Sequence, residues 1–211
     1  MKIALIGATG TIGRRIAAEA LQRGHQITAV LRQPKKLGDD RLKAVQGDVT
    51  DPASLAKAVA GHDAVISAVG PAQGGPPTLP AYAARALVHA LPKAGVKRLI
   101  VVGGAGSLEV KPGLQLVDTP EFPAAWKPVA LSHRDSLKIF RDSGSALDWT
   151  YVSPAALIEP GVRAGKYRTG GDQLLVDGKG RSYITAEDFA AALLDELENP
   201  KNLKRRMTVA Y

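Results

Sequence analysis

The chain has no cysteine among its 211 residues. Disulfide bonds, cysteine-ligated zinc, iron–sulfur clusters and a thiol nucleophile are therefore all excluded. Aromatic residues are also scarce, at 5% of the chain, which leaves little material for stacking the bases of a nucleic acid. The four histidines are too scattered along the chain to suggest a metal site, and we expect none.

Long apolar runs are missing as well. The N-terminal run, residues 3–6, is too short for the core of a signal peptide. No stretch of the sequence approaches the roughly 18 apolar residues that span a bilayer. We therefore expect a soluble, cytoplasmic protein without a membrane partner.

The net charge is +8, from 28 basic and 20 acidic residues. A basic surface suits either a nucleic acid or a phosphorylated small ligand. We interpret the densest basic run, residues 201–206, as a solvated tail rather than a nucleic-acid contact. The expected partner is a small molecule and not a nucleic acid, and the protein is either a monomer or a homodimer.

Short apolar runs alternate with segments of helical spacing in the first half of the chain. Strands are expected at residues 3–6, 26–31, 42–46, 63–69 and 98–102. Helices are expected between them, at residues 12–23, 52–60 and 81–94. This alternation predicts an α/β fold, with a doubly wound parallel sheet of the Rossmann type and helices on both faces.

The second half of the chain is less regular. A helix at 131–142, a strand at 148–152, a helix that begins near Thr185, and a last strand at 206–210 are expected, with Thr185 and Asp188 as a variant capping box. Three segments rich in Gly, Pro or polar residues lie outside these elements: 71–80, 105–131 and 155–175. Long irregular segments are usually functional. We therefore assign them to the substrate side of a single domain, 1–211, with a small irregular C-terminal substrate region.

Three glycines spaced three apart, Gly7, Gly10 and Gly13, join the first expected strand to the first helix. A strand that turns into a helix in this way leaves the helix N–H groups and the positive dipole end facing the loop, which favours an anion. Gly7 allows the turn, Gly10 lets a pyrophosphate approach the backbone, and Gly13 lets the helix pack close to the sheet. The spacing is GxxGxxG, and its position between strand and helix predicts dinucleotide binding.

The end of the second expected strand favours one dinucleotide over the other. Arg32 follows this strand, and no carboxylate occurs before Asp39. NAD-binding proteins place an acid here for the ribose hydroxyls, whereas NADP-binding proteins place an arginine that pairs with the 2′-phosphate. The position therefore favours NADPH, and a solvated basic turn is the alternative.

Two further stretches suit the same ligand. Asp48 follows the third expected strand, where its carboxylate could accept a hydrogen bond from the adenine amino group. A helix cap is the alternative, but Asp51 already fills that role. The small residues at 67–71 would let a dinucleotide lie across the strand ends, or they could serve tight packing alone.

Several motifs together resemble the atypical short-chain dehydrogenase/reductase superfamily: GATGTIG, the arginine after the second strand, GDVTD and SAVG. More narrowly, VVGGAGSL, KIFRDSG, LDWTYVSPA and ITAEDFAAALLDELENP resemble the bacterial NADH-flavin reductases, which are relatives of biliverdin reductase B. The resemblance covers nearly the whole chain. It implies a Rossmann-type fold, NADP(H) as cofactor, and FMN, FAD, riboflavin, a quinone or a tetrapyrrole as acceptor rather than as bound cofactor.

The resemblance also implies roles for single residues. Arg32 and Lys36 would hold the 2′-phosphate, while Ser107 and His133 would face the nicotinamide and act as candidate catalytic residues. The residues expected at the cofactor are Gly7, Thr9, Gly10, Thr11, Ile12, Gly13, Arg32, Lys36, Asp48, Val49, Ala68, Val69, Gly70 and Gly106. Outside the motifs, Trp126 could cover the acceptor ring, and Arg134 and Lys138 could attract an acidic acceptor or be solvated.

The chain departs from the superfamily in one respect, because none of its five tyrosines has a lysine four residues later. The YxxxK motif supplies an activated phenol that protonates a developing alkoxide. Hydride transfer to a flavin does not need that acid, since the flavin ring system spreads the charge and the site only has to hold two rings together. The sequence therefore favours an NADPH-dependent reductase of flavins. A non-catalytic NADP(H) sensor of the NmrA-like type is the alternative.

Overall fold

The computed structural model describes residues 1–37, 39–72 and 74–211, and of Lys36 it describes the backbone alone. The strands of the described chain are β1 (Lys2–Ile6), β2 (Gln26–Leu31), β3 (Lys43–Gln46), β4 (Ala64–Ser67), β5 (Arg98–Val102), β6 (Glu109–Lys111), β7 (Leu114–Gln115), β8 (Asp148–Ser153), β9 (Leu157–Glu159), β10 (Arg168–Gly170), β11 (Tyr183–Thr185) and β12 (Arg205–Ala210). The α-helices are α1 (Thr11–Gln22), α2 (Pro52–Val59), α3 (Leu79–Lys93), α4 (Lys127–Asp142) and α5 (Ala186–Glu198). Three short 3₁₀ turns are η1 (Pro34–Lys36), η2 (Leu116–Asp118) and η3 (Ala124–Trp126).

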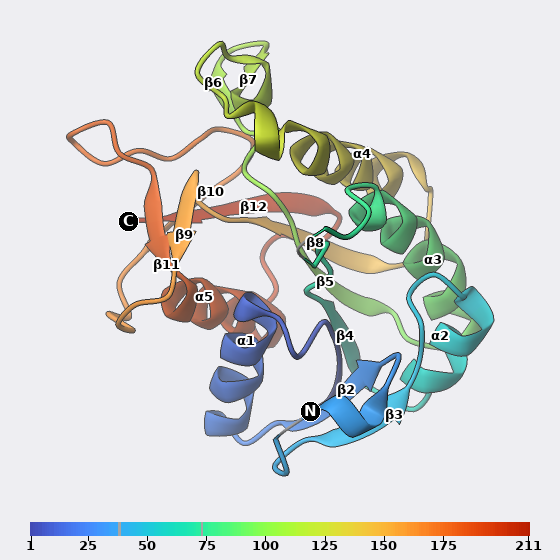
Figure 1. The fold of residues 1–211 in the computed structure, drawn as a ribbon. Coiled ribbons are helices and arrows are strands. Elements are labelled where there is room, and N and C mark those ends of the chain that lie inside the picture. Colours follow the sequence, from blue (N-terminus) through green and yellow to red (C-terminus); the bar gives the residue numbers. More distant parts are fainter. Residues whose placement is uncertain (38, 73) are drawn as a thin grey trace.

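The main sheet of the described chain holds eight strands in the order β10-β12-β8-β5-β4-β1-β2-β3. Its strands pair in parallel, except that β10 runs antiparallel to β12 at one edge. Helices α1 and α5 cover one face, and α2, α3 and α4 cover the other (Figure 1). The predicted doubly wound α/β fold is confirmed.

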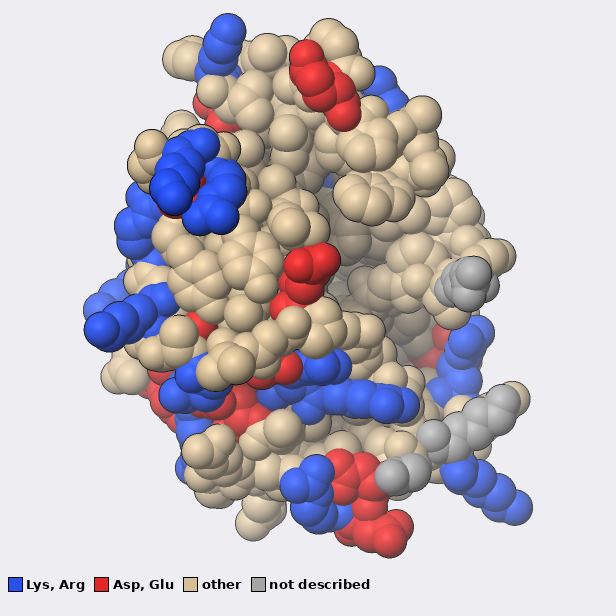
Figure 2. Space-filling view, turned by 60° about the vertical axis from the view of Figure 1, so that its left-hand side comes forward, with Lys and Arg blue, Asp and Glu red and all other residues tan. Residues whose placement is uncertain are grey.

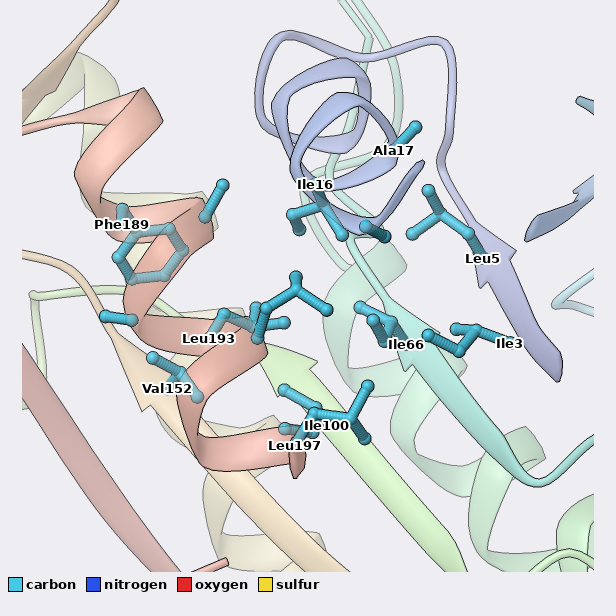
Figure 3. Close-up of a cluster of buried hydrophobic side chains, with 14 of the residues drawn as sticks. Ile3, Leu5, Ile16, Ala17, Ile66, Ile100, Val152, Phe189, Leu193 and Leu197 are labelled. Atoms are coloured by element: carbon cyan, nitrogen blue, oxygen red, sulfur yellow. The ribbon is translucent and has the colours of Figure 1, made fainter. Parts of the chain in front are cut away.

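Alternate side chains of β1 enter the two cores on opposite faces of the sheet. Ile3 and Leu5 belong to the core under α1 and α5, while Ala4 and Ile6 belong to the other core. A strand buried on both faces has no polar side to show, which explains the continuous apolar run at residues 3–6. Figure 3 shows side chains of β1, α1 and α5 gathered in the first of these cores.

The strand order determines where a ligand can lie. The chain proceeds from β1 outward through β2 and β3, and then returns to the other side of β1 to form β4, β5 and β8. The order therefore reverses between β1 and β4. In open sheets of this kind, ligands bind at the carboxyl ends of the strands beside such a reversal, so the loops that follow β1 and β4 form the centre of the candidate site.

Some element boundaries differ from the predicted ones. Helices α3 and α4 begin at Leu79 and Lys127 rather than at 81 and 131, because Pro80 and Pro128 lie in their first turns. A proline is accepted there since the N–H that it lacks has no partner within the helix. Strand β4 ends at Ser67, short of the predicted 69. The hairpin of β6 and β7 lies in the segment 105–131, which was expected to be irregular.

The prediction of a solvated tail at 201–206 is wrong for its last residue, Arg206. Arg205 and Arg206 begin β12, which lies between β10 and β8 inside the sheet. Arg206 is 4% exposed, and its Nε donates to Oδ1 of Asp172 at 2.7 Å. The positive charge of this run is therefore partly used inside the fold.

Candidate functional site

The loop between β1 and α1 is closed so tightly that two of its three glycines have no room for a side chain. Gly7 has a φ of +83°, and a β-carbon on it would lie 2.4 Å from the carbonyl oxygen of Ala68. A β-carbon on Gly13 would lie 2.0 Å from the carbonyl oxygen of Gly7. Both obstacles are backbone atoms, so these glycines bring the loop, α1 and the end of β4 together.

Gly10 differs from the other two glycines of the loop. A β-carbon there would have Gly7 O, at 3.4 Å, as its nearest neighbour, and its φ of −75° is open to any residue. Gly10 is the N-cap of α1 and makes no side-chain cap, whereas Asp51 caps α2 and Thr185 caps α5 through their side chains. The first turn of α1, including Thr11 and Ile12, therefore receives no side-chain oxygen from its cap.

The end of β2 forms the wall of a pocket beside this loop. Thr9, Leu31, Arg32 and Gln33 line the pocket, which has a volume of about 360 Å³. Arg32 is exposed there, so its guanidinium is accessible to a ligand. The structure thus brings together Thr9 and Arg32, two residues expected at the cofactor. The side chain of Lys36, expected beside them, lies outside the description.

Asp48 lies near Arg32 at the end of β3. Its Oδ1 accepts hydrogen bonds from the N–H and the hydroxyl of Thr50, each at 2.8 Å. The Thr50 backbone bond, the Thr50 hydroxyl and the charge of Arg32 hold the pKa of the Asp48 carboxyl below its usual value. Asp48 is therefore ionised and fixed at the strand end, as contact with an adenine would require, and that contact stays a prediction.

Four further residues expected at the cofactor also follow the carboxyl ends of the strands. Ala68 and Val69 are half-buried after β4, and Gly70 is exposed. The N–H of Ala68 donates to the carbonyl of Ile6 at 2.9 Å, which ties this segment to β1. Val49, after β3, is half-buried too. The ends of β1, β2, β3 and β4 therefore form one continuous edge.

An apolar pocket of about 560 Å³ lies at the ends of β5 and β8. Figure 2 shows a hollow in this face of the molecule, with mostly uncharged residues around it. The pocket is walled by the loop after β5, the segment from η2 to α4, and the segment after β8. Its lining residues are Gly104, Ala105, Gly106, Leu116, Thr119, Glu121, Phe122, Pro123, Ala125, Trp126, Val129, Ala130, His133, Pro154, Ala155, Ala156, Leu157 and Ile158.

Glycines after β5 let this loop pack directly on α4 and β8. A β-carbon on Gly103 would lie 2.0 Å from Cε1 of Tyr151, and one on Gly106 would lie 2.8 Å from Cβ of Ala130. Gly106 lines the apolar pocket, where the sequence placed it beside the nicotinamide. The small residues of VVGGAG are therefore required by close packing.

His133 lies in the second turn of α4 and lines the apolar pocket. Its Nδ1 is 3.3 Å from the hydroxyl oxygen of Tyr151, and that hydroxyl donates to the backbone carbonyl of His133 at 2.8 Å. Since the hydroxyl has a single proton and gives it to the carbonyl, we assign the imidazole proton to Nδ1. Nε2 is then an acceptor.

Burial sets the charge of both groups. It lowers the pKa of His133 to about 4, so the imidazole is neutral near pH 7. Burial also raises the pKa of Tyr151 well above its ordinary value, so the phenol keeps its proton. His133 can therefore orient a ligand by accepting a hydrogen bond, but it is not an imidazolium acid at neutral pH.

Ser107 does not lie in the pocket, contrary to the prediction. It is 3% exposed and is absent from the lining residues. Its hydroxyl accepts a hydrogen bond from Nη1 of Arg206 at 2.9 Å, and its carbonyl accepts one from Nη2 at 3.2 Å. The side chain is turned toward β12, so in this structure it anchors the loop after β5 instead of facing a nicotinamide.

The three segments assigned to the substrate side differ in what they contribute. Much of 105–131 lines the apolar pocket, but of 155–175 only residues 155–158 do so. Further along, Arg163 forms an ion pair with Glu19 of α1 at 2.9 Å, which directs this part of the segment toward α1 and α5. None of the described residues of 71–80 lines the pocket.

Two residues of the site were not singled out from the sequence. Glu121 lies in the pocket wall, between Pro120 and Pro123, within the segment TPEFPAAW. An isolated acid in such an apolar segment was a usable signal. For Tyr151 there was no such signal in the sequence, because its contact with His133 joins residues that are distant along the chain.

The described residues lack the features of two other kinds of site. No group of three or more His, Asp or Glu there could hold a metal ion. Nor does any helix in that part of the chain have the length and apolar character needed to cross a membrane.

A parallel sheet whose first strand passes through closely packed glycines into a helix defines the class of Rossmann-type dinucleotide-binding proteins. The chain also matches the model of the NAD(P)H-binding family over residues 7–200. It belongs to that family.

Similar proteins support the narrower resemblance. YwnB of Bacillus subtilis, an uncharacterized protein, is 42% identical over 99% of this chain and 98% of its own length. A solved structure from Burkholderia pseudomallei, named as a candidate exported protein, has 52% identity and a TM-score of 0.92, with 100% of both chains covered. A candidate NADH-flavin reductase from Streptococcus pneumoniae has 34% identity and a TM-score of 0.89, covering 100% of this chain and 99% of that one. The resemblance to this group of reductases is confirmed.

Proposed function

We propose that this protein is a reductase that passes a hydride from NADPH to a flavin or a similar conjugated acceptor. One observation carries the proposal: the glycine loop with Arg32 lies after β1 and β2, the apolar pocket with His133 lies after β5 and β8, and both are at the carboxyl ends of one sheet, with β4 alone between the two pairs of strands. The first region suits a phosphorylated nucleotide, and the second suits an uncharged ring.

Three features of the chain support NADPH as the nucleotide. The first turn of α1 presents backbone N–H groups that its glycine cap leaves without a side-chain partner, and these suit the pyrophosphate. Gly7 and Gly13 keep the backbone close enough for this contact. We assign the 2′-phosphate to Arg32, because its guanidinium lines the pocket beside the loop and an acid at this position would repel that phosphate. NADPH, when bound, supplies the hydride.

The apolar pocket is suited to hold the acceptor. Trp126 is 61% exposed although it lines the pocket, and Leu157 lines it with an exposure of 45%. Such exposed apolar groups can cover a flat ring and keep water from it. The acceptor gains the hydride with both of its electrons, and a proton from water completes the reduction. The role of the protein is then proximity and exclusion of water, with His133 as an orienting acceptor.

The position of the tyrosines supports this chemistry over carbonyl reduction. Tyr151, which contacts His133, is fully buried and gives its proton to a backbone carbonyl. No lysine lies four residues beyond any tyrosine. The phenol that protonates an alkoxide in classical members of the superfamily therefore has no counterpart at Tyr151.

The proposal includes the setting of the reaction. The partner is a small-molecule acceptor, without a nucleic-acid or membrane partner, in a monomer or a homodimer. We assign the activity to the cytoplasm, where reduced nicotinamide nucleotides are regenerated. Cell fractionation followed by immunoblotting tests this, since recovery outside the cytoplasm would contradict it.

The function itself is tested by mixing the purified protein with NADPH and a panel of flavins, quinones and tetrapyrroles. Loss of the nicotinamide absorbance band together with reduction of an acceptor is the expected result. Tight binding of NADPH without turnover of any acceptor would instead support the NADP(H) sensor. Absence of NADPH binding in calorimetry would overturn both interpretations.

A further inference from the structure

The apolar pocket carries an unusual charge for so basic a protein. Its only ionisable lining side chains among the described residues are Glu121 and His133. His133 is neutral because burial lowers its pKa to about 4. Glu121 is exposed and has no ion pair with a described residue. The pocket therefore presents a single carboxylate, while the whole chain carries a net charge of +8.

The arginines that come near this pocket in the chain are held elsewhere. Arg134, the neighbour of His133, donates to Asp118 at 3.2 Å. Arg163, which follows the wall at 155–158, pairs with Glu19 at 2.9 Å. Neither lines the pocket, and Lys127, next to Trp126, does not line it either.

Arg206 is also unavailable. It lies beneath the loop after β5 and donates to Asp172 and Ser107. It is 4% exposed and does not line the pocket. The exposed guanidinium of Arg32 lies in a separate pocket, after β2. A phosphate or carboxylate group on an acceptor would therefore lie near the carboxylate of Glu121, with no positively charged side chain among the lining residues.

We propose that this pocket selects acceptors without an anionic side group, such as riboflavin or a neutral quinone, over phosphorylated flavins such as FMN. This inference rests on the proposed function, and it names the acceptor class within it. Its physical basis is that an anion entering an apolar pocket loses hydration, gains no opposite charge, and is repelled by Glu121.

The size of the preference follows from the position of Glu121. Because this side chain is exposed, water and salt weaken its repulsion of a phosphate. We expect FMN to bind about threefold to tenfold more weakly than riboflavin at low ionic strength. The ratio should shrink as salt is added, because screening acts on the charged ligand alone.

The experiment is a fluorescence titration of riboflavin and of FMN with the protein saturated with NADP⁺. The variant Glu121→Gln keeps the size of the side chain and removes its charge, so it should tighten FMN binding more than riboflavin binding and bring the ratio of the two dissociation constants closer to one. Asp135→Asn is the matched control, because Asp135 is an exposed acid on α4 that does not line the pocket. Asp135→Asn should leave the ratio of the two dissociation constants as it is.

Equal affinities for the two flavins would overturn the inference, and so would a ratio that Glu121→Gln does not change or a failure of both flavins to bind. The proposed function is judged separately, by consumption of NADPH. If riboflavin binds better than FMN but no acceptor is reduced, the charge selectivity stands and the reductase assignment fails. If both flavins are reduced and bind with equal affinity, the reductase assignment stands and the charge selectivity fails.

Discussion

At the scale of single residues, two glycines of the first loop have different tasks, and substitution can separate them. In Gly13→Ala the new β-carbon meets the backbone oxygen of Gly7 at 2.0 Å, so the helix must move. We expect the free energy of unfolding to fall by about 3 kcal/mol. In Gly10→Ala the nearest atom is 3.4 Å away, so stability should change by less than about 1 kcal/mol.

For Gly10→Ala we expect a large effect on NADPH binding, in contrast to its small effect on stability. Its β-carbon would stand where the pyrophosphate approaches, so the folded Gly10→Ala protein should bind NADPH at least about tenfold more weakly. Urea unfolding and calorimetry on both variants check this pair of effects. Unchanged NADPH affinity in Gly10→Ala would show that the dinucleotide does not lie against this loop.

The proposed preference for NADPH over NADH depends on Arg32. Arg32→Asp replaces a paired guanidinium by a charge that repels the 2′-phosphate, so NADPH should bind about 10-fold to 100-fold more weakly. NADH lacks that phosphate and should lose far less. Lys57→Asp makes the same change of charge on the exposed side of α2 and serves as the control. Calorimetry with both nucleotides gives the result, and equal losses for NADPH and NADH would refute the role of Arg32.

At the scale of elements, the sequence predicts those whose signals are local. The apolar run of β1, the glycines after it, and the caps Asp51 and Thr185 all act within a few residues, and the structure contains each of them. The starts of α3 and α4 were placed too late because a proline is compatible both with a loop and with a first helical turn. The place of β12 inside the sheet depends on a distant partner, β8, that no local pattern reveals.

The link between β12 and the loop after β5 gives a prediction at this scale. Arg206→Met removes the donors to Ser107 and one partner of Asp172, which keeps Arg141. We expect the free energy of unfolding to fall by about 1–3 kcal/mol, because the buried oxygens of Ser107 lose their hydrogen bonds.

The neighbouring arginine of the same strand provides the control for this effect. Arg205 is exposed, so Arg205→Met should change stability by less than about 0.5 kcal/mol. Urea unfolding of the two variants decides the matter. If both lose the same stability, the Arg206 contacts do not hold the loop.

At the scale of the whole molecule, the two halves of the site differ in how far sequence reasoning could predict them. The proposed nucleotide half repeats one rule, that candidate residues follow the carboxyl ends of successive strands, and Arg32 and Asp48 both lie there. The acceptor half is built from Gly106, Trp126 and Leu157, which only the folded chain brings together. Ser107 was misplaced for the same reason, since its partner Arg206 lies at the far end of the sequence.

The stability of the whole molecule should depend on pH through His133. Burial lowers its pKa from 6.5 to about 4 in the folded protein, whereas the unfolded chain keeps an ordinary histidine. Between these two pKa values the unfolded chain binds a proton that the folded protein does not. Stability is therefore lost as pH falls through this window, by an amount on the order of 3 kcal/mol in total.

Urea unfolding at pH 7 and pH 5 measures the upper part of this loss, and His133→Gln should reduce it although the variant is less stable at both pH values. Buried and paired carboxyls such as Glu19 and Glu187 have lowered pKa values and also lose stability in acid, but they do so equally in both proteins. His89→Gln, on the exposed face of α3, should keep the full dependence. If His133→Gln keeps it too, burial does not lower the pKa of His133 in the folded protein. The neutral state assigned to the imidazole throughout the acid range down to about pH 4 would then be lost.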